Sequence, residues 1–147
     1  MLIGLDPVLT PELLSHLRAM GHGDEIVIAD GSFPATTVAT RLVRLDGIGL
    51  RRALRAILAV MPIDESEPDP ALGMEVIGAP EQRVAMHGEI STCVAEADSR
   101  VELRLLERHA FYARAKQAFT VVATGETAFY GNVILRKGTI DAPVDLS

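Results

Sequence analysis

This sequence has few cysteines, no basic clusters and no long apolar runs. The single cysteine, Cys93, excludes a disulfide within the chain and any metal cluster built on cysteine ligands. The net charge is −6 and no run of Lys or Arg occurs, so we expect no nucleic-acid partner. The longest apolar run, 56–61, is far shorter than the roughly 20 residues that a membrane-spanning helix needs. We therefore expect no membrane association.

Several signature motifs are also missing. The first residues lack the basic segment and apolar run of a signal peptide, so we expect a cytoplasmic protein. The segments Gly21–Gly23 and Gly47–Gly49 do not form a Gly-x-Gly-x-x-Gly dinucleotide fingerprint, and neither a P-loop nor a Gly-x-Ser-x-Gly motif occurs. His87 and Cys93 have no partners at ligand spacing, so we expect no metal site. His16 lies away from the apolar stripe of its helix, and we expect it to be solvated.

The chain has enough hydrophobic residues to form one sizeable core. Its 147 residues are 48% hydrophobic and 23% charged, which fits a single globular domain over 1–147. Apolar spacing and capping residues predict helices at 11–20, 50–61, 79–97 and 108–119. Short apolar runs predict strands at 25–29, 38–45, 74–77, 101–106, 120–123 and 132–136, with a surface loop at 64–72 and an exposed tail from Gly138. This alternation predicts an α/β domain with a mostly parallel sheet.

His22 and Asp30 lie at the two ends of the predicted strand 25–29. A histidine between two glycines can exchange protons near neutral pH and leaves room for a ligand, but it can equally serve as a helix C-cap. Asp30 follows the strand and precedes a glycine. It can cap the loop by accepting backbone N–H groups, or it can orient His22 or accept a substrate hydroxyl.

Two further groups of polar residues stand in the C-terminal third. Arg108 and Tyr112 are four residues apart on a predicted helix and so share a face, which suits a polyhydroxylated or anionic ligand. The alternative is an ordinary solvated helix start. Tyr130 and Asn132 flank a glycine just before the last strand, where they can hold sugar hydroxyls or simply form a turn.

Taken together, these segments resemble the RbsD/FucU family of D-ribose pyranases and L-fucose mutarotases, and are most similar to the fucose branch. The resemblance covers nearly the whole length, although 51–100 matches only in pattern. It rests on these motifs: Thr10-Pro11-Glu12-Leu13-Leu14, Met20-Gly21-His22-Gly23-Asp24-Glu25, Phe33-Pro34-Ala35, Phe111-Tyr112-Ala113-Arg114-Ala115, Thr124-Gly125-Glu126 and Tyr130-Gly131-Asn132-Val133-Ile134-Leu135-Arg136-Lys137-Gly138.

The resemblance implies a three-layer α/β/α fold and an enzyme that interconverts the anomers of L-fucose or a related aldose without a cofactor. It implies that His22 is the general acid. It also implies sugar-binding roles for Asp30, Arg108, Tyr130 and Asn132, with Tyr112 beside them. The resemblance further implies self-association into a ring-shaped homo-oligomer, typically a decamer, with active sites near subunit contacts. The alternatives are a ribose-type pyranase and a non-catalytic monosaccharide-binding protein. The segment Gly31–Ser32 and the histidine after Arg108 depart from the family pattern and leave the sugar open.

Overall fold

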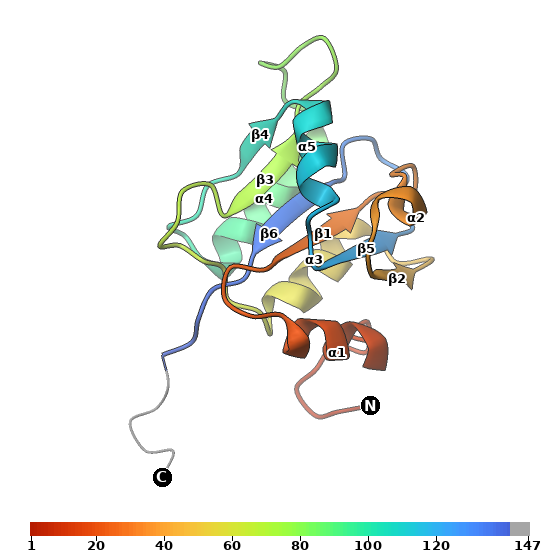
Figure 1. Ribbon diagram of the computed structural model, residues 1–147, viewed down its shortest axis with the longest axis vertical. Helices are drawn as coiled ribbons and strands as arrows, with labels where there is room; N and C mark the ends of the chain where they lie inside the picture. Colours follow the sequence, from red (N-terminus) through yellow and green to blue (C-terminus); the bar gives the residue numbers. More distant parts are fainter. Residues whose placement is uncertain (142–147) are drawn as a thin grey trace.

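A six-stranded sheet with strand order β2-β5-β1-β6-β3-β4 runs through the centre of the molecule (Figure 1). The computed structural model describes residues 1–141, so the last six residues of the expected domain lie outside the described part. The strands are β1 (Glu25–Ala29), β2 (Leu42–Leu45), β3 (Ala71–Met74), β4 (Arg104–Leu106), β5 (Thr120–Thr124) and β6 (Val133–Arg136). The helices are α1 (Pro11–Ala19), α2 (Ala35–Val38), α3 (Leu50–Leu58), α4 (Ala85–Ala97) and α5 (Arg108–Ala115).

The strand directions confirm the predicted mostly parallel sheet. β5 pairs in parallel with β1 on one side and with β2 on the other, and β3 pairs in parallel with β4. β6 runs antiparallel to both of its neighbours, β1 and β3. Thus β6 alone among the six described strands runs against the others. Because β6 lies next to β1, the loop before β6 meets the end of β1.

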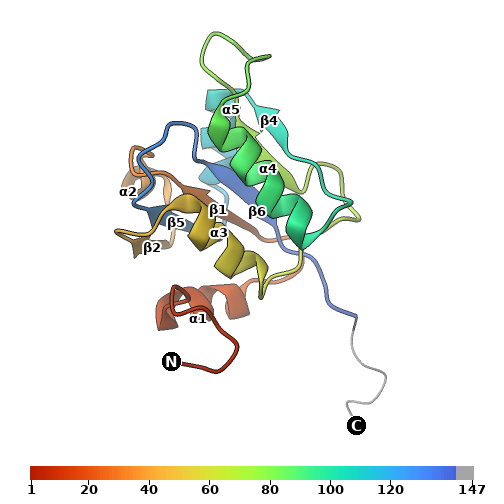
Figure 2. The same cartoon turned by 180° about the vertical axis from the view of Figure 1, so that it is seen from behind.

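Alternating side chains of β1 divide the interior into two cores. Ile26 and Ile28 pack with α1, α3 and α4, whereas Val27 and Ala29 pack with α2 and α5. Figure 1 shows α2 and α5 in front of the sheet, and Figure 2 shows α3 and α4 covering its back. Strands buried on both faces consist of near-continuous apolar residues, as Ile26–Ala29 of β1 do. The fold is therefore the expected three-layer α/β/α arrangement.

Local capping signals set the starts of two helices as predicted. The Thr10 side chain accepts a hydrogen bond from the Leu13 N–H at 3.2 Å, and Pro11 occupies the first helical position of α1. At α5, the Glu107 carboxylate accepts from the N–H groups of His109 and Ala110. These bonds stabilise the ionised carboxylate at the positive end of the helix, and they hold the pKa of Glu107 below its usual range.

Several predicted boundaries were wrong, and for the third strand the reason is that pairing with distant strands overrides the local pattern. The third strand is Ala71–Met74, and its first two residues lie in the segment predicted as a loop. They form a strand because this segment pairs with β6 on one side and with β4 on the other. The short helix α2 and strand β2 together replace the strand predicted at 38–45. Helix α4 begins at Ala85 instead of 79, after a turn with Gly78 at φ +73°. Helix α5 ends at Ala115, four residues earlier than expected.

Two expectations about exposure were also wrong. His16 is half-buried, since its Nδ1 lies 2.9 Å from the Thr120 hydroxyl and its ring meets Phe119 edge-on. Gly138 is buried, and exposure begins only at Thr139 within the described part of the tail. No helix within residues 1–141 is long and apolar enough to cross a membrane.

Candidate functional site

Asp30 and Asn132 form a buried pair where β1 ends and β6 begins. The Asp30 N–H donates to Asn132 Oδ1 at 3.0 Å, and Asn132 Nδ2 donates back to Asp30 Oδ2 at 3.2 Å. Asp30 also accepts from the N–H groups of Ser32 and Gly131. In open α/β sheets, ligands bind beyond the carboxyl ends of the strands. This pair stands at such an end and presents a carboxylate and an amide together.

Burial governs the charge of Asp30. Its side chain is 5% exposed, and this desolvation raises the pKa of the carboxyl above its usual range. Hydrogen bonds from the Ser32, Gly131 and Phe33 N–H groups and from Asn132 oppose that rise. The raised pKa brings the carboxylate closer to the range in which a group can exchange protons with a substrate.

Tyr130 has an unusual backbone conformation beside this pair. Its φ of 63° lies in the left-handed region, which a bulky residue rarely adopts. Its hydroxyl accepts a hydrogen bond from the Ile77 N–H at 3.1 Å, and its ring lies 5.9 Å from the ring of His87. Strain of this kind persists only where surrounding contacts hold it, and it concentrates at functional sites.

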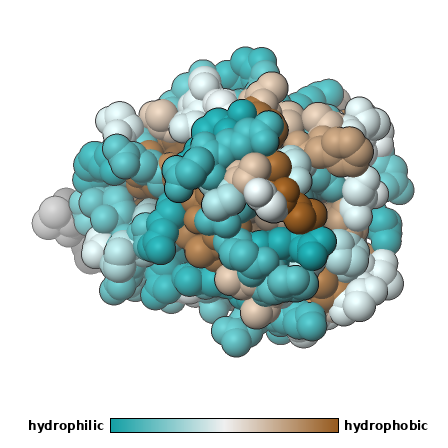
Figure 3. Space-filling view, turned by 90° about the horizontal axis from the view of Figure 1, so that it is seen from above, coloured by the Kyte–Doolittle hydropathy of each residue, from teal (hydrophilic) through white to brown (hydrophobic). Residues whose placement is uncertain are grey.

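These residues open into a cavity of about 370 Å³, which is large enough for a small organic ligand. Tyr112 reaches it from α5, and apolar side chains surround the polar end. The lining residues are Asp30, Ser32, Phe33, Met74, Ile77, Tyr112, Phe129, Tyr130 and Asn132. Ile77 and Phe129 are exposed at its rim. Seen from above, a group of apolar side chains is exposed on the mainly hydrophilic surface at this end of the molecule (Figure 3).

Arg108 lies outside the lining of this cavity. It is the first residue of α5, one turn before Tyr112, and its guanidinium is 3.4 Å from His109 Nε2. It is partly exposed. Of the six residues singled out from the sequence, four line the cavity: Asp30, Tyr112, Tyr130 and Asn132.

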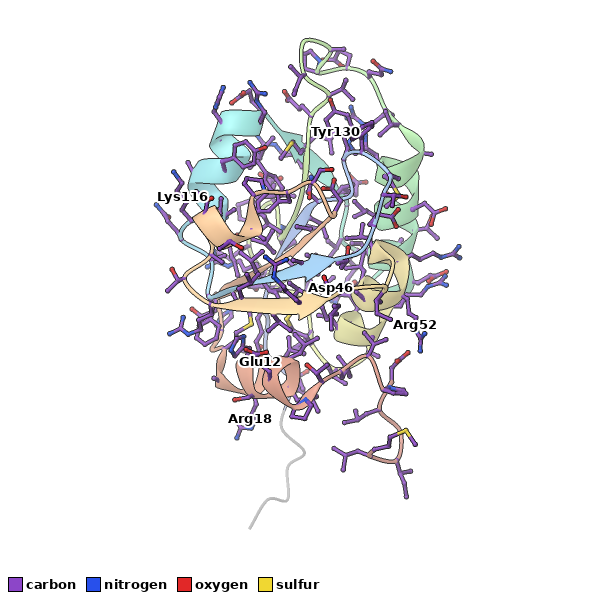
Figure 4. The ribbon with its side chains drawn as sticks, turned by 90° about the vertical axis from the view of Figure 1, so that its right-hand side faces the viewer. Glu12, Arg18, Asp46, Arg52, Lys116 and Tyr130 are labelled. Atoms are coloured by element: carbon purple, nitrogen blue, oxygen red, sulfur yellow. The ribbon has the colours of Figure 1, made fainter. Side chains whose placement is uncertain are left out.

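His22 lies at the opposite end of β1, where that strand begins. The five residues of β1 span about 13 Å between their terminal Cα atoms, so one monosaccharide cannot touch His22 and Asp30 of the same copy. Figure 4 shows Tyr130 at the other end of the molecule from Arg18, which lies on the helix that leads to His22. Asp30 therefore does not orient His22, contrary to one sequence-based interpretation.

The residue that orients His22 is Asp64. His22 Nε2 lies 3.0 Å from Asp64 Oδ2, and the same oxygen accepts from Arg136 Nε at 3.1 Å. The Ser66 hydroxyl donates to Asp64 Oδ1 at 2.6 Å. These bonds, that from Ser66 foremost, hold the pKa of the Asp64 carboxyl below its usual range. Asp64 is 3% exposed, whereas 55% of the His22 side chain is exposed.

Neither Asp64 nor His87 is recognisable as a site residue from its local sequence. Asp64 lies in the segment predicted as a surface loop, and nothing in its local sequence shows that its backbone pairs with β6. In the structure, its N–H donates to the Arg136 carbonyl at 3.0 Å. His87 is buried and bridges two segments near the cavity. Its Nδ1 accepts from the Val84 N–H and its Nε2 donates to the Met74 carbonyl at 2.8 Å. Burial lowers the pKa of His87, which keeps the ring neutral.

The donors and acceptors at both ends of β1 suit polar organic ligands more than metal ions. Within residues 1–141, no group of three or more His, Cys, Asp or Glu side chains is placed to hold a metal. Each buried side-chain nitrogen or oxygen in that same part of the chain has a hydrogen-bond partner. The arrangement can therefore bind hydroxyl groups at the Asp30 cavity and exchange protons at His22.

Fold and site together define a three-layer α/β/α protein with a small polar-ligand cavity at the sheet's carboxyl edge. The family model described as the RbsD / FucU transport protein family matches residues 3–140. The chain belongs to the RbsD/FucU family.

Named relatives match along nearly their whole length. The fucose mutarotase of Mus musculus is 42% identical, with 94% of each chain covered. The L-fucose mutarotase of Glaesserella parasuis is 40% identical, covering 99% of this chain and 100% of the relative. The crystal structure of the fucose mutarotase from Streptococcus pneumoniae in complex with L-fucose superposes with a TM-score of 0.88 at 35% identity, covering 95% of this chain and 100% of that one.

Proposed function

We propose that this protein is a mutarotase that interconverts the α and β anomers of L-fucose, or of a closely related aldose, without a cofactor. The observation that carries the proposal is the buried Asp30–Asn132 pair at the polar end of a largely apolar cavity. Relatives along the full length that are named fucose mutarotases support the same reaction.

The polar and the apolar residues of the cavity bind different parts of the sugar. The Asp30 carboxylate and the Asn132 amide accept from and donate to ring hydroxyls, and the phenols of Tyr112 and Tyr130 add two further groups of the same kind. Apolar walls such as Met74 suit the methyl carbon of a 6-deoxy sugar. Arg108, at the start of α5, anchors a hydroxyl at the outer side of the bound sugar.

The reaction needs two proton transfers. A base removes the proton of the anomeric hydroxyl while the C1–O5 bond breaks, and an acid protonates O5, which leaves the open-chain aldehyde. The C1–C2 bond rotates and the ring recloses on the other face of C1. We assign the acid to His22, because its ring is exposed and held by Asp64. Asp30, Tyr130 or a water molecule supplies the base. General acid–base catalysis contributes about 10²–10⁴-fold.

Because the two ends of β1 lie about 13 Å apart, we infer that a second copy of the chain completes the site. We propose that the copies self-associate into a ring, as a decamer, in which His22 of one copy faces the Asp30 cavity of the next. The exposed Ile77 and Phe129 at the cavity rim support such a contact, since apolar rims of this kind mark binding surfaces. We also place the protein in the cytoplasm.

Saturation-exchange NMR tests the proposal over a panel of L-fucose, D-ribose, galactose and rhamnose. We expect faster exchange between the α and β pyranose signals of L-fucose in the presence of the protein. Exchange limited to pyranose and furanose forms of ribose would identify a pyranase instead. Binding of a sugar without any faster exchange would overturn the mutarotase assignment in favour of a binding protein.

A further inference from the structure

The segment Arg136–Gly138, at the end of β6, has no part in the cavity described above. It is nevertheless the end of one of the motifs, residues 130–138, on which the resemblance to the RbsD/FucU family rests. The segment lies beside the loop that carries His22, as Figure 1 shows where the C-terminal run passes the start of β1. The Gly23 N–H donates to the Lys137 carbonyl at 2.8 Å, and the Lys137 N–H donates to the Asp24 carbonyl at 2.9 Å.

Lys137 also fixes the helix that precedes this loop. Its ammonium donates to the carbonyls of Leu17 and Met20 at 2.8 and 2.6 Å, where α1 ends. A cation at a helix C-terminus satisfies orphan carbonyls and complements the negative end of the dipole. Lys137 therefore holds the chain immediately before His22, while its backbone holds the chain immediately after it.

Gly138 allows the segment that carries Asp64, between α3 and β3, to approach closely. Its N–H donates to the Pro62 carbonyl at 2.9 Å, and a Cβ at this position would lie 2.6 Å from the Ile63 carbonyl oxygen. Any larger residue would push the two segments apart, because such contacts are shorter than van der Waals separation. The distance between Asp64 and His22 depends on this close packing.

Arg136 completes the arrangement through its side chain. Its Nε donates to Asp64 Oδ2, the same oxygen that lies against His22 Nε2. The guanidinium passes close to Gly23, where a Cβ would lie 3.1 Å from Arg136 Nη2, and where φ is +87°. A side chain at position 23 would therefore disturb both the loop and the guanidinium.

The electrostatic consequence concerns which nitrogen of His22 carries the proton. An ionised carboxylate is an acceptor only. Asp64 is kept ionised, since Ser66, Arg136 and His22 lower the pKa of its carboxyl. The nitrogen that faces Asp64 must then be the protonated one, so the neutral imidazole has its hydrogen on Nε2. The other nitrogen, Nδ1, makes no hydrogen bond within residues 1–141, and 55% of the His22 side chain is exposed.

We propose that Arg136 is a positioning residue which, through Asp64, holds His22 in the Nε2–H tautomer, so that Nδ1 is the atom that reacts with the substrate. Nδ1 takes up a proton to form the imidazolium, gives this proton to O5 when the sugar ring opens, and takes it back when the ring closes. The inference rests on the proposed role of His22 as the acid. It extends that role by naming the reacting nitrogen and the residue that selects it.

Nitrogen-15 NMR of the histidine rings in the intact protein, at about pH 8.5 and so above the ordinary histidine pKa of roughly 6.5, tests the tautomer directly. We expect His22 in the wild type to show a protonated Nε2 and a bare Nδ1. Arg136→Met should replace this pattern with averaged shifts and slow the anomer exchange by about 10- to 100-fold, with a smaller change in sugar affinity. Arg136→Lys should restore most of both, because an ammonium can still donate to Asp64.

Arg55→Met is the matched control. It removes an arginine that pairs with Glu96 on the surface of α3 and α4, and it should leave both readouts unchanged. A wild-type His22 with its proton on Nδ1, or Arg136→Met with an unchanged tautomer and unchanged exchange, would overturn the inference. If Arg136→Met does not fold, the wild-type tautomer and Arg136→Lys decide. Undiminished exchange in His22→Gln would refute the proposed acid instead, whatever the tautomer shows.

Discussion

Asp30 and Asn132, 102 positions apart in the chain, hydrogen-bond to each other twice, through a backbone donor of one and a side-chain donor of the other. This reciprocal pair ties the end of β1 to the start of β6 and orients the carboxylate at the cavity. It follows that Asn132 contributes to both the stability of the fold and the geometry of the site.

Asn132→Ala should therefore lower the free energy of unfolding and weaken sugar binding together. The change leaves the buried Asp30 N–H without its acceptor, which costs about 1–3 kcal/mol. Denaturant unfolding and NMR titration with L-fucose measure the two effects. Thr124→Val is the control, since it removes another buried hydrogen bond, to the Ala29 carbonyl, outside the cavity lining. An Asn132→Ala protein with wild-type sugar affinity would contradict the assigned role.

The separation of His22 from Asp30 predicts complementation between inactive variants. His22→Gln and Asp30→Ala should each abolish catalysed anomer exchange, because each removes one half of every site. After mixing, unfolding and reassembly in equal amounts, about a quarter of the shared sites should contain both wild-type halves, and exchange should return to that fraction. Reassembled mixtures that stay inactive, although mass spectrometry shows mixed oligomers, would mean that each copy builds its own site.

The two tyrosines of the cavity should differ in their effect on stability. The Tyr130 hydroxyl accepts from the Ile77 N–H, so Tyr130→Phe should cost about 0.5–1.5 kcal/mol. The Tyr112 hydroxyl makes no hydrogen bond within residues 1–141, and Tyr112→Phe should leave the free energy of unfolding unchanged. Both changes should weaken sugar binding. Equal stability losses in the two variants, measured by urea unfolding, would argue against the Tyr130–Ile77 contact.

His87 should make the fold less stable in acid. Burial lowers its pKa in the folded state, so the unfolded state binds the proton more readily. The penalty is absent above the ordinary histidine pKa of about 6.5 and grows as the pH falls below that value toward the lowered pKa of the folded state. His87→Gln has no such titration, yet it can still donate to the Met74 carbonyl and accept from the Val84 N–H.

The stability difference between wild type and His87→Gln should therefore shift in favour of the variant as the pH falls from about 7.5 to about 5.5, a range that spans the ordinary histidine pKa. Urea unfolding at both pH values measures it. Asp30 and the other titrating groups are common to both proteins, so their effects cancel in the difference. A difference that is independent of pH would show that His87 has an unshifted pKa.

Local sequence accounts for much of the fold. The runs Ile26–Ala29 and Val121–Ala123 are apolar on both faces, which requires burial between two helical layers, and both belong to central strands. Thr10 and Pro11 begin a helix as their cap preferences predict. Such features depend on neighbours within a few residues, so a single sequence is enough to find them.

The third strand and the start of α4 could not be found in this way. Residues 71–74 contain a glycine and follow two prolines, so their local pattern resembles a loop. They become a strand because β6 and β4 supply hydrogen-bond partners on both edges. The start of α4 depends on His87, whose ring accepts from the Val84 N–H while its other nitrogen reaches β3.

For the site, the sequence by itself determined that His22 and Asp30 flank one buried strand, and that Tyr130 and Asn132 precede another. Only the tertiary structure decided which residues are partners. β6 runs antiparallel to β1, which brings Asn132 to Asp30 at one end and Arg136 to the His22 loop at the other. The backbone pairing between the end of β6 and the segment before β3 places Asp64 beside His22. The His22–Asp64 and Asp30–Asn132 contacts join residues that are 42 and 102 positions apart. Such contacts depend on how distant strands pair, and a one-residue shift in that pairing would turn the side chains to the other face of the sheet.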